Sequence, residues 1–189
     1  MALRSTHIAV SETIISSYLL MTQQSIPVDI VSLVGTWIGV QIPDLDSGNT
    51  PMNRALGPMG TLIGHLFKHR TWTHTIWAVI FMFVISYLLP TPQSFNFAGN
   101  RNYIHVIYWM AAWGYFLHLL EDSLSYQGVC WLYPLQRFKI SRAGHRYRQR
   151  PWHWYYYRTG GQEETVIRFI AWWTLICLLT IIFMNNYTH

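Results

Sequence analysis

Apolar residues along the chain fall into five runs that polar segments separate. Three of the runs are strongly apolar and cover residues 75–89, 103–120 and 166–184. Each lies near the lower limit of about 17–20 residues that a helix needs to cross a bilayer. Two weaker runs, 8–21 and 28–42, come first and carry Ser, Thr, Glu or Gln. We therefore predict an all-α, polytopic helical membrane protein of about five helices, with the two weaker helices packed against the others or crossing as short or tilted spans.

Composition agrees with a membrane location. The chain is 51% hydrophobic, 16% aromatic and only 11% charged, whereas a soluble globular domain is about 25% charged. Its 10 Trp and 12 Tyr suit a belt of aromatic side chains at the membrane interface. The length of 189 residues predicts a single membrane-embedded domain over residues 1–189. The net charge of +5 fits either an anionic lipid surface or a nucleic acid, and the hydrophobicity favours membrane lipid over nucleic acid as the partner.

Three polar segments, 47–64, 90–102 and 137–158, set the expected orientation. Segment 137–158 holds most of the positive charge, and the positive-inside rule places it in the cytoplasm. Alternating helices then put segment 90–102 and the C-terminus outside, and residues 47–73 and the N-terminus inside. We expect 47–64, which is rich in Gly and Pro, to be a loop.

Acidic residues and histidines gather near the ends of the predicted helices. In the topology above, the members of this set all fall at the cytoplasmic end of the bundle, although they are far apart in the sequence. They are His7, Asp44, Asp46, His69, His74, His118, Glu121, Asp122, Glu163 and Glu164. Such groups are costly to desolvate and persist when they are paired or bound to metal. Imidazole and carboxylate without thiolate suit zinc, manganese or iron, and two ions bridged by an Asp need about this many ligands.

Each motif also has a simpler structural interpretation. His118 and Asp122 share a helix face at i, i+4 and could form a buried hydrogen-bonded pair. The PDLD stretch could be a turn, and Thr73 could cap the helix that follows HRTWTHT. The basic, aromatic segment 137–158 could be a membrane anchor. The sequence contains no HExxH, GxSxG or P-loop motif, which excludes the commonest zinc proteases, α/β-hydrolases and P-loop nucleotide hydrolases.

An ordered set of motifs carries a family resemblance. Five motifs follow one another along nearly the whole chain, and they are THIA, PDLDS, HRTWTHT, GYFLHLLEDSLSYQGVCWLYP and TGGQEE. This order resembles the YdjM-like bacterial inner-membrane proteins, a family of predicted metal-dependent hydrolases. Trp72 after Thr71, Thr75 and Ser125 depart from the usual residues of the family, and none of these changes removes a candidate ligand. The resemblance implies a place in the bacterial inner (cytoplasmic) membrane, and the predicted topology turns the active site toward the cytoplasm.

The YdjM-like family is in turn distantly similar to zinc-dependent phospholipases C and to zinc-dependent single-strand nucleases. Those enzymes are helical and use a small cluster of zinc ions to cleave phosphoesters. The similarity implies that His118 and Asp122 are a His-x3-Asp ligand pair and that Asp122 also serves a second ion. The full ligand set that it implies is His7, Asp46 or Asp44, His74, His118 and Asp122. The chain lacks the N-terminal Trp ligand of the secreted phospholipases, for which His145, His153 or Glu164 are the available substitutes.

From this resemblance we expect a hydrolase that cleaves a phosphoester, in a phospholipid headgroup, with water activated by two divalent ions, most simply zinc. The expected catalytic residues are Asp44 or Asp46 as the base, His69 as a ligand or as a donor that orients one, and Glu164. The expected phosphate-binding residues are Arg70, Arg142 and Arg146, with Arg148 as a further candidate. Glu121 is expected to face away from the metal and to pair with an arginine.

Two other classes of function remain open from the sequence. A metal-dependent nuclease would agree with the basic segment 137–158, and strongly salt-sensitive oligonucleotide binding would favour it. A non-enzymatic membrane protein could hold a structural or a transported metal, and a closed coordination shell would favour the structural case. The three strong runs carry few polar residues apart from His105 and Arg168, which argues against transport.

Overall fold

The computed structural model describes residues 4–47, 50, 54–66, 72–90, 96–97, 101–125, 128–135, 139–140, 146–147, 157 and 159–187. Within these residues the bundle is built of helices, as the hydropathy pattern predicts, and the strands form only two short hairpins. Its five long helices are α1 (Arg4–Thr22), α2 (Ile26–Gln41), α5 (Ile76–Leu88), α6 (Tyr103–Leu124) and α7 (Gln162–Tyr187). Each of the five apolar runs is thus confirmed as a helix. The remaining elements are α4 (Pro58–Leu66), the short 3-10 helices η1 (Pro43–Asp46) and η2 (Trp72–His74), and the strands β1 (Asn96–Phe97), β2 (Arg101–Asn102), β3 (Lys139–Ile140) and β4 (Arg146–Tyr147).

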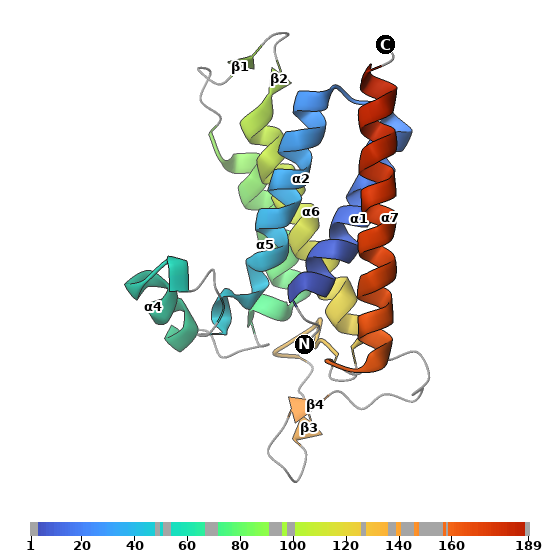
Figure 1. Ribbon diagram of the computed structural model, residues 1–189. Helices are drawn as coiled ribbons and strands as arrows, with labels where there is room; N and C mark the ends of the chain where they lie inside the picture. The colour runs from blue at the N-terminus through green and yellow to red at the C-terminus, as the bar shows by residue number, and fades with distance from the viewer. Residues whose placement is uncertain are drawn as a thin grey trace.

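Helix α4 begins inside the segment 47–64 that the sequence predicts as a loop, so that prediction is wrong for residues 58–64. Pro58 opens the helix, where a fixed φ and a missing N–H do no harm. Met59, Leu62, Ile63 and Leu66 follow at helical spacing, a pattern that the Gly and Pro content of the segment hides. α4 stands beside the N-terminal end of the bundle (Figure 1).

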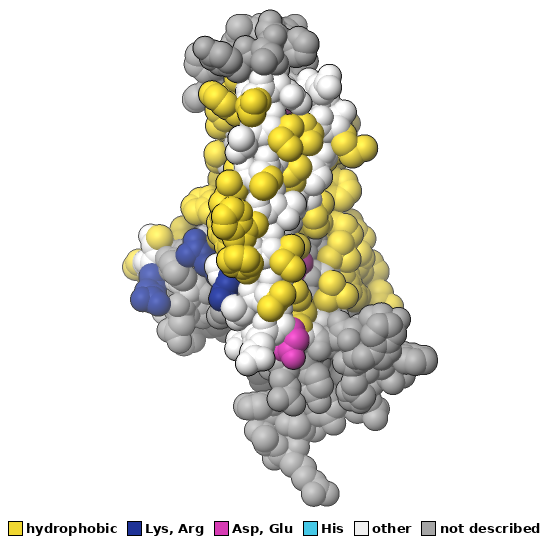
Figure 2. All heavy atoms as spheres, turned by 45° about the vertical axis from the view of Figure 1, so that its right-hand side comes forward, with side chains coloured by type: hydrophobic (Ala, Val, Ile, Leu, Met, Phe, Trp, Pro, Cys, Tyr) yellow, Lys and Arg dark blue, Asp and Glu magenta, His cyan; other side chains and the backbone are white. Residues whose placement is uncertain are grey.

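The helices form an elongated bundle with two distinct ends. Figure 1 shows the N-terminus, α4 and the β3–β4 hairpin at one end, and the C-terminus and the β1–β2 hairpin at the other. In the view of Figure 2, hydrophobic side chains cover the shaft and the large charged side chains lie toward its lower part. By length and composition, the described segments Ile26–Asp46 and Gln162–Asn186 could each cross a bilayer, and α5 is a shorter apolar helix.

Helix α6 is the centre of the bundle. Leu117 of α6 packs with Ile15 and Leu19 of α1, while Tyr115 and Leu119 pack with Val79 of α5. Its other neighbour, α2, approaches it most closely. α7 rests on α1 and leaves most of its apolar side chains exposed, as expected of a helix whose outer face meets lipid.

Glycines allow α2 and α6 to touch through their backbones. A Cβ atom at Gly39 would lie 2.0 Å from the carbonyl oxygen of Ala111, and one at Gly114 would lie 2.4 Å from that of Thr36. Small residues permit such close crossings in membrane bundles. The polar residues of the second run are buried at this crossing, where the hydroxyl of Ser32 donates to Val28 O and that of Thr36 donates to Ser32 O.

We expect Gly39→Val to destabilise the protein by about 3 kcal/mol, the upper end of the usual cost of overpacking, because α2 must move away from α6. Thermal unfolding of the detergent-purified protein measures this change. Thr174→Val, on the exposed face of α7, introduces the same residue where no helix packs closely and should change stability by less than about 0.5 kcal/mol. Equal unfolding temperatures for the two variants would contradict the close crossing.

Candidate metal centre

Figure 1 shows that α1 and α5 begin, and α2 and α6 end, at one end of the bundle. Six titratable side chains meet there. They come from four separate parts of the chain. They are His7 of α1, Asp44 and Asp46 of η1, His74 of η2, and His118 and Asp122 of α6. All six are buried, and Asp44 is the most exposed at 7%. The convergence that the topology predicts is therefore present in the structure.

Local structure fixes each of these side chains. After α2 ends, Pro43 opens the single 3-10 turn that carries Asp44 and Asp46 inward. His118 and Asp122 lie one helical turn apart on α6 and share a face. His74 is held by its neighbours, because the hydroxyl of Tyr115 donates to the carbonyl of Thr73.

The start of α5 is capped by Thr75. Its hydroxyl accepts a hydrogen bond from Ala78 N at 3.2 Å and donates one to Trp72 O at 2.9 Å. The prediction that Thr73 caps this helix is wrong, because Thr73 lies two residues before the N-cap and its hydroxyl donates to Asp46 instead.

Two overlapping groups of three side chains have the proximity of metal ligands. The first is His7, His118 and Asp122, and the second is Asp44, His74 and His118. Within each group, one ligand atom per residue lies within 4.8 Å of the others. His118 belongs to both groups, whereas the family resemblance implies that Asp122 is the shared residue.

The two carboxylate oxygens of Asp122 face different histidines. Oδ1 lies 3.4 Å from Nε2 of His7, and Oδ2 lies 3.6 Å from Nε2 of His74 and 4.0 Å from Nε2 of His118. Asp44 Oδ1 lies 3.7 Å from the same nitrogen of His118. Asp122 therefore has the geometry to bridge two ions, as the resemblance implies.

These separations are longer than a normal hydrogen bond but suit two ligands of one ion. A tetrahedral ion with bonds of about 2.0–2.1 Å holds its ligand atoms about 3.3–3.4 Å apart. The Nε2 atoms of His7 and His118 are buried and have no hydrogen-bond partner among the described residues. A buried polar atom that lacks a partner costs free energy. A divalent ion between these nitrogens and Asp122 would satisfy them, so the residues present fit a metal centre.

Glu121 holds His7 from the side away from Asp122. Its Oε2 lies 2.9 Å from Nδ1 of His7, and its Oε1 accepts a hydrogen bond of 2.7 Å from the hydroxyl of Ser11. A carboxylate on the far nitrogen fixes the tautomer and ring orientation of a metal-binding histidine. The expectation that Glu121 faces away and pairs with an arginine is wrong, because α1 packs where both Glu121 and Asp122 can reach His7.

The carboxylate of Asp46 lies beside Nδ1 of His74, just as the carboxylate of Glu121 lies beside Nδ1 of His7. Asp46 Oδ2 lies 3.5 Å from Nδ1 of His74, whose Nε2 faces Asp122. Thr73 donates its hydroxyl to the same carboxylate oxygen. Of the two acids in the PDLD turn, Asp44 belongs to a candidate ligand group and Asp46 lies behind a candidate ligand.

Other expected site residues lie elsewhere. Glu164 is buried in the first turn of α7, where its carboxylate accepts a hydrogen bond from Gly160 N, and it belongs to neither ligand group. Arg146 lies in β4, where it pairs with Ile140 of β3 in the hairpin register. The residues that fall outside the described part of the chain are His69, Arg70, Arg142, His145, Arg148 and His153.

Three supporting residues escape the sequence analysis, namely Ser11, Thr73 in its contact with Asp46, and Tyr115. Ser11 follows His7 by four residues and so shares its helix face. That spacing is a signal for Ser11. Nothing in the sequence links Thr73 or Tyr115 to its partner, because those contacts depend on how separate elements pack.

A family model described as "YdjM inner membrane protein" matches residues 1–188 of the chain. It agrees with the resemblance found in the ordered motifs. No curated protein and no solved structure matches the chain.

We expect Asp122→Asn to abolish stoichiometric metal binding, because Asp122 faces all three histidines. Metal content of the purified protein, measured by mass spectrometry after loading with zinc or manganese, tests this. Glu163→Gln removes a carboxylate from the exposed start of α7 and is expected to keep the wild-type metal content. Equal metal content in Asp122→Asn and the wild type would rule out the group of His7, His118 and Asp122 as a metal site and would rule out Asp122 as a bridge between two ions.

A second expectation concerns Glu121. Loss of a carboxylate that orients a ligand typically weakens metal affinity by about 10–100-fold, so Glu121→Gln should weaken zinc binding without abolishing it. Competitive titration with a chelator of known affinity measures the change. An affinity within about twofold of the wild type would show that the His7–Glu121 contact does not support the metal centre.

Proposed function

The chain belongs to the YdjM inner membrane protein family, and we propose that it is a membrane-bound, metal-dependent hydrolase that cleaves a phosphoester in a lipid headgroup. One observation carries the proposal. Three histidines and two aspartates from four elements converge at one end of an apolar helical bundle, with spacings that suit metal ligands. Structural hydrogen bonding alone does not require so many buried imidazoles and carboxylates in one place.

The donor set limits the choice of ion. It consists of imidazole nitrogens and carboxylate oxygens, and neither cysteine belongs to the two groups in the described part of the chain. Zinc, manganese and iron accept such ligands. We assign one ion to His7, His118 and Asp122 and a second to Asp44, His74 and the other face of Asp122. A bound ion of this kind supplies a Lewis acid and activates water for hydrolysis.

The residues around the ligands have distinct roles in this proposal. Glu121 and Asp46 each hold the Nδ1 side of a histidine, which leaves Nε2 directed at the centre. Asp44 is the most exposed member of the cluster, so substrate and water approach from its side. Asp44 is also placed to accept a proton there. Glu164, which caps its own helix start, has no role in the chemistry that we propose.

A lipid substrate agrees with the position of the site. The cluster lies at the end of a shaft whose exposed surface is rich in large hydrophobic side chains (Figure 2). In the membrane arrangement that we propose, this position is at the depth of the lipid headgroups. Arg70, Arg142 and Arg146 remain our candidates for binding the phosphate, since guanidinium groups match its geometry.

We further propose a multi-pass arrangement in the inner membrane with the site facing the cytoplasm. The N-terminus and the β3–β4 hairpin, which lies in the basic segment 137–158, are at the end of the bundle that holds the cluster (Figure 1). The C-terminus is at the opposite end. The positive-inside rule then turns the cluster toward the cytoplasm.

A second candidate function is supported by the burial of the cluster. All six side chains are buried, and structural metal sites are closed whereas catalytic sites keep an open position. A metal that only holds α1, η1, η2 and α6 together would bind without turnover. Removal of such a metal should lower the unfolding temperature and leave no activity to lose.

We expect the metal-loaded protein in mixed micelles to release a phosphorylated headgroup or phosphate from at least one class of phospholipid. Phosphorus NMR of the water-soluble products measures the release. Asp122→Asn should reduce the rate at least about 10³-fold, the scale of losing a principal electrostatic contributor, while Glu163→Gln should keep it.

The same preparation should be assayed with a labelled single-stranded oligonucleotide. Cleavage of the oligonucleotide but of no phospholipid would replace the lipid proposal with a nuclease. Stoichiometric metal with no cleavage of either substrate would support the structural candidate and reject the hydrolase.

A further inference from the structure

A groove of about 610 Å³ runs between α1, α2 and α7, on a different face of α1 from the metal centre. This volume is within the range of about 300–1,000 Å³ for small-molecule sites. Several of the side chains that line the groove are apolar or aromatic and are exposed at the surface, among them Val34, Trp37 and Trp172. The groove is therefore open at the surface of the shaft. Its lining is completed by Arg4, Ser5, Ile8, Glu12, Leu33, Leu175 and Leu179.

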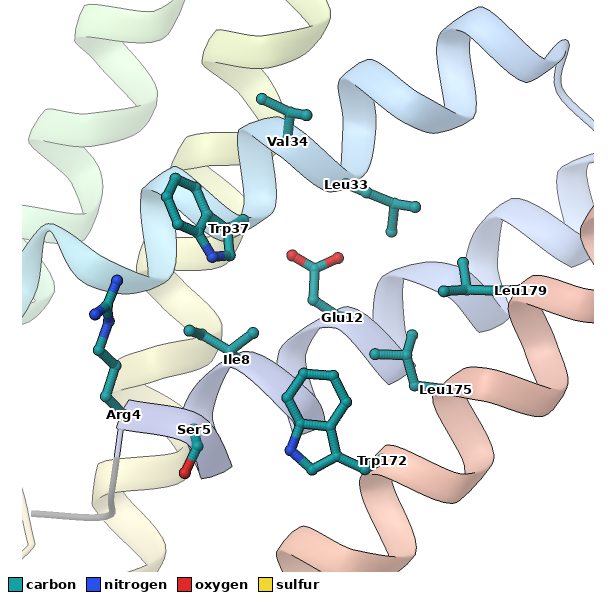
Figure 3. Close-up of a pocket in the computed structure, with 10 residues that line it drawn as sticks. All are labelled: Arg4, Ser5, Ile8, Glu12, Leu33, Val34, Trp37, Trp172, Leu175 and Leu179. Carbon is teal, nitrogen blue, oxygen red and sulfur yellow. The ribbon is translucent and has the colours of Figure 1, made fainter.

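Glu12 is an unusual residue for such a place. Figure 3 shows its carboxyl in the middle of the groove, with Leu33 and Trp37 on one side and Trp172 on the other. Glu12 is only 6% exposed, and its Oε1 has no hydrogen-bond partner among the described residues. An ionisable side chain in a membrane segment is expensive and marks a functional site by default.

The chemistry of the lining changes along the groove. Arg4 lies at one end, where its guanidinium donates to the side-chain oxygen of Gln41, and Leu175 and Leu179 lie at the other (Figure 3). Glu12 lies eight residues after Arg4 on the same helix, a rise of about 12 Å. The lining of the groove thus changes from a cation to a carboxyl that can hydrogen-bond, and then to an apolar stretch. This order runs toward the middle of the bundle.

That order matches the parts of a lipid. We propose that the groove binds a single-chain phospholipid with a free hydroxyl beneath its phosphate. The phosphate lies toward Arg4, the hydroxyl bonds Glu12 and the acyl chain lies against Leu175 and Leu179. A hydroxyl suits Glu12 because it can donate to a carboxylate or accept from a carboxylic acid. An ordinary hydrocarbon chain would leave the carboxyl without a partner.

This binding site goes beyond the proposed function, because lipid would occupy it whether or not the metal centre hydrolyses anything. The two sites share α1, since His7 and Ser11 face the metal centre while Ile8 and Glu12 face the groove. If the hydrolase proposal also holds, the groove would keep a lipid substrate or product beside the centre.

The test is photo-crosslinking with lysophosphatidylglycerol that carries a diazirine near the end of its acyl chain. The purified protein is labelled without added metal, and mass spectrometry locates the label. We expect label in the peptides that hold Leu33, Leu175 and Leu179, and competition by unlabelled lipid. The matched ligand has a hydrogen atom in place of the glycerol-backbone hydroxyl and should label about tenfold less, since at that position it can neither donate a hydrogen bond to Glu12 nor accept one from it.

Two variants separate the groove from the rest of the surface. Glu12→Leu replaces the carboxyl with an apolar side chain of similar size and should fold, but it should label equally with the hydroxyl ligand and with the ligand that lacks the hydroxyl. Asp122→Asn should label as the wild type does, so failure of the metal centre leaves this result unchanged. Label spread evenly over the exposed face of α7, or equal labelling by the two ligands in the wild type, would overturn the proposal.

Discussion

The cost of burying Asp122 at the end of an apolar bundle is the constraint on which the rest of the structure depends. Its carboxylate is fully buried and faces the Nε2 atoms of three histidines at 3.4–4.0 Å. A carboxylate in such surroundings requires positive charge or strong hydrogen bonding. A divalent ion between the aspartate and the imidazoles would meet that requirement and would explain why four separate elements meet at one point.

The packing of the helices sets the positions of the side chains around Asp122. Backbone contact between α2 and α6 at Gly39 and Gly114 sets how far the η1 turn stands from α6, and so the distance from Asp44 to His118. α1 brings His7 and Ser11 against Glu121. On its other face α1 forms a wall of the groove that contains Glu12. One helix thus connects a polar centre with an apolar site that is open to the surface of the bundle.

Much of this architecture could be predicted from the sequence, because hydropathy alone marks five helices and their alternation gathers the histidines and acids at one end. Helix rotation and the fine geometry could not be predicted. Glu121 and Asp122 are neighbours that should point about 100° apart on a helix, yet both reach His7, since its ring lies between them. The choice between Asp44 and Asp46 depended on the exact 3-10 turn. Helix α4 was hidden by its Gly and Pro residues, and the groove arises only from the packing of three helices.

X-ray absorption spectroscopy of the zinc-loaded, detergent-purified protein tests the central claim most directly. The account predicts a first shell of nitrogen and oxygen at about 2.0–2.1 Å, with the outer-shell scattering of at least two imidazole rings and no sulfur. A first shell that contains sulfur would show that the metal binds the cysteines instead. A first shell of oxygen alone would indicate metal bound to surface acids. Either result would contradict a metal centre built from His7, His74, His118 and Asp122.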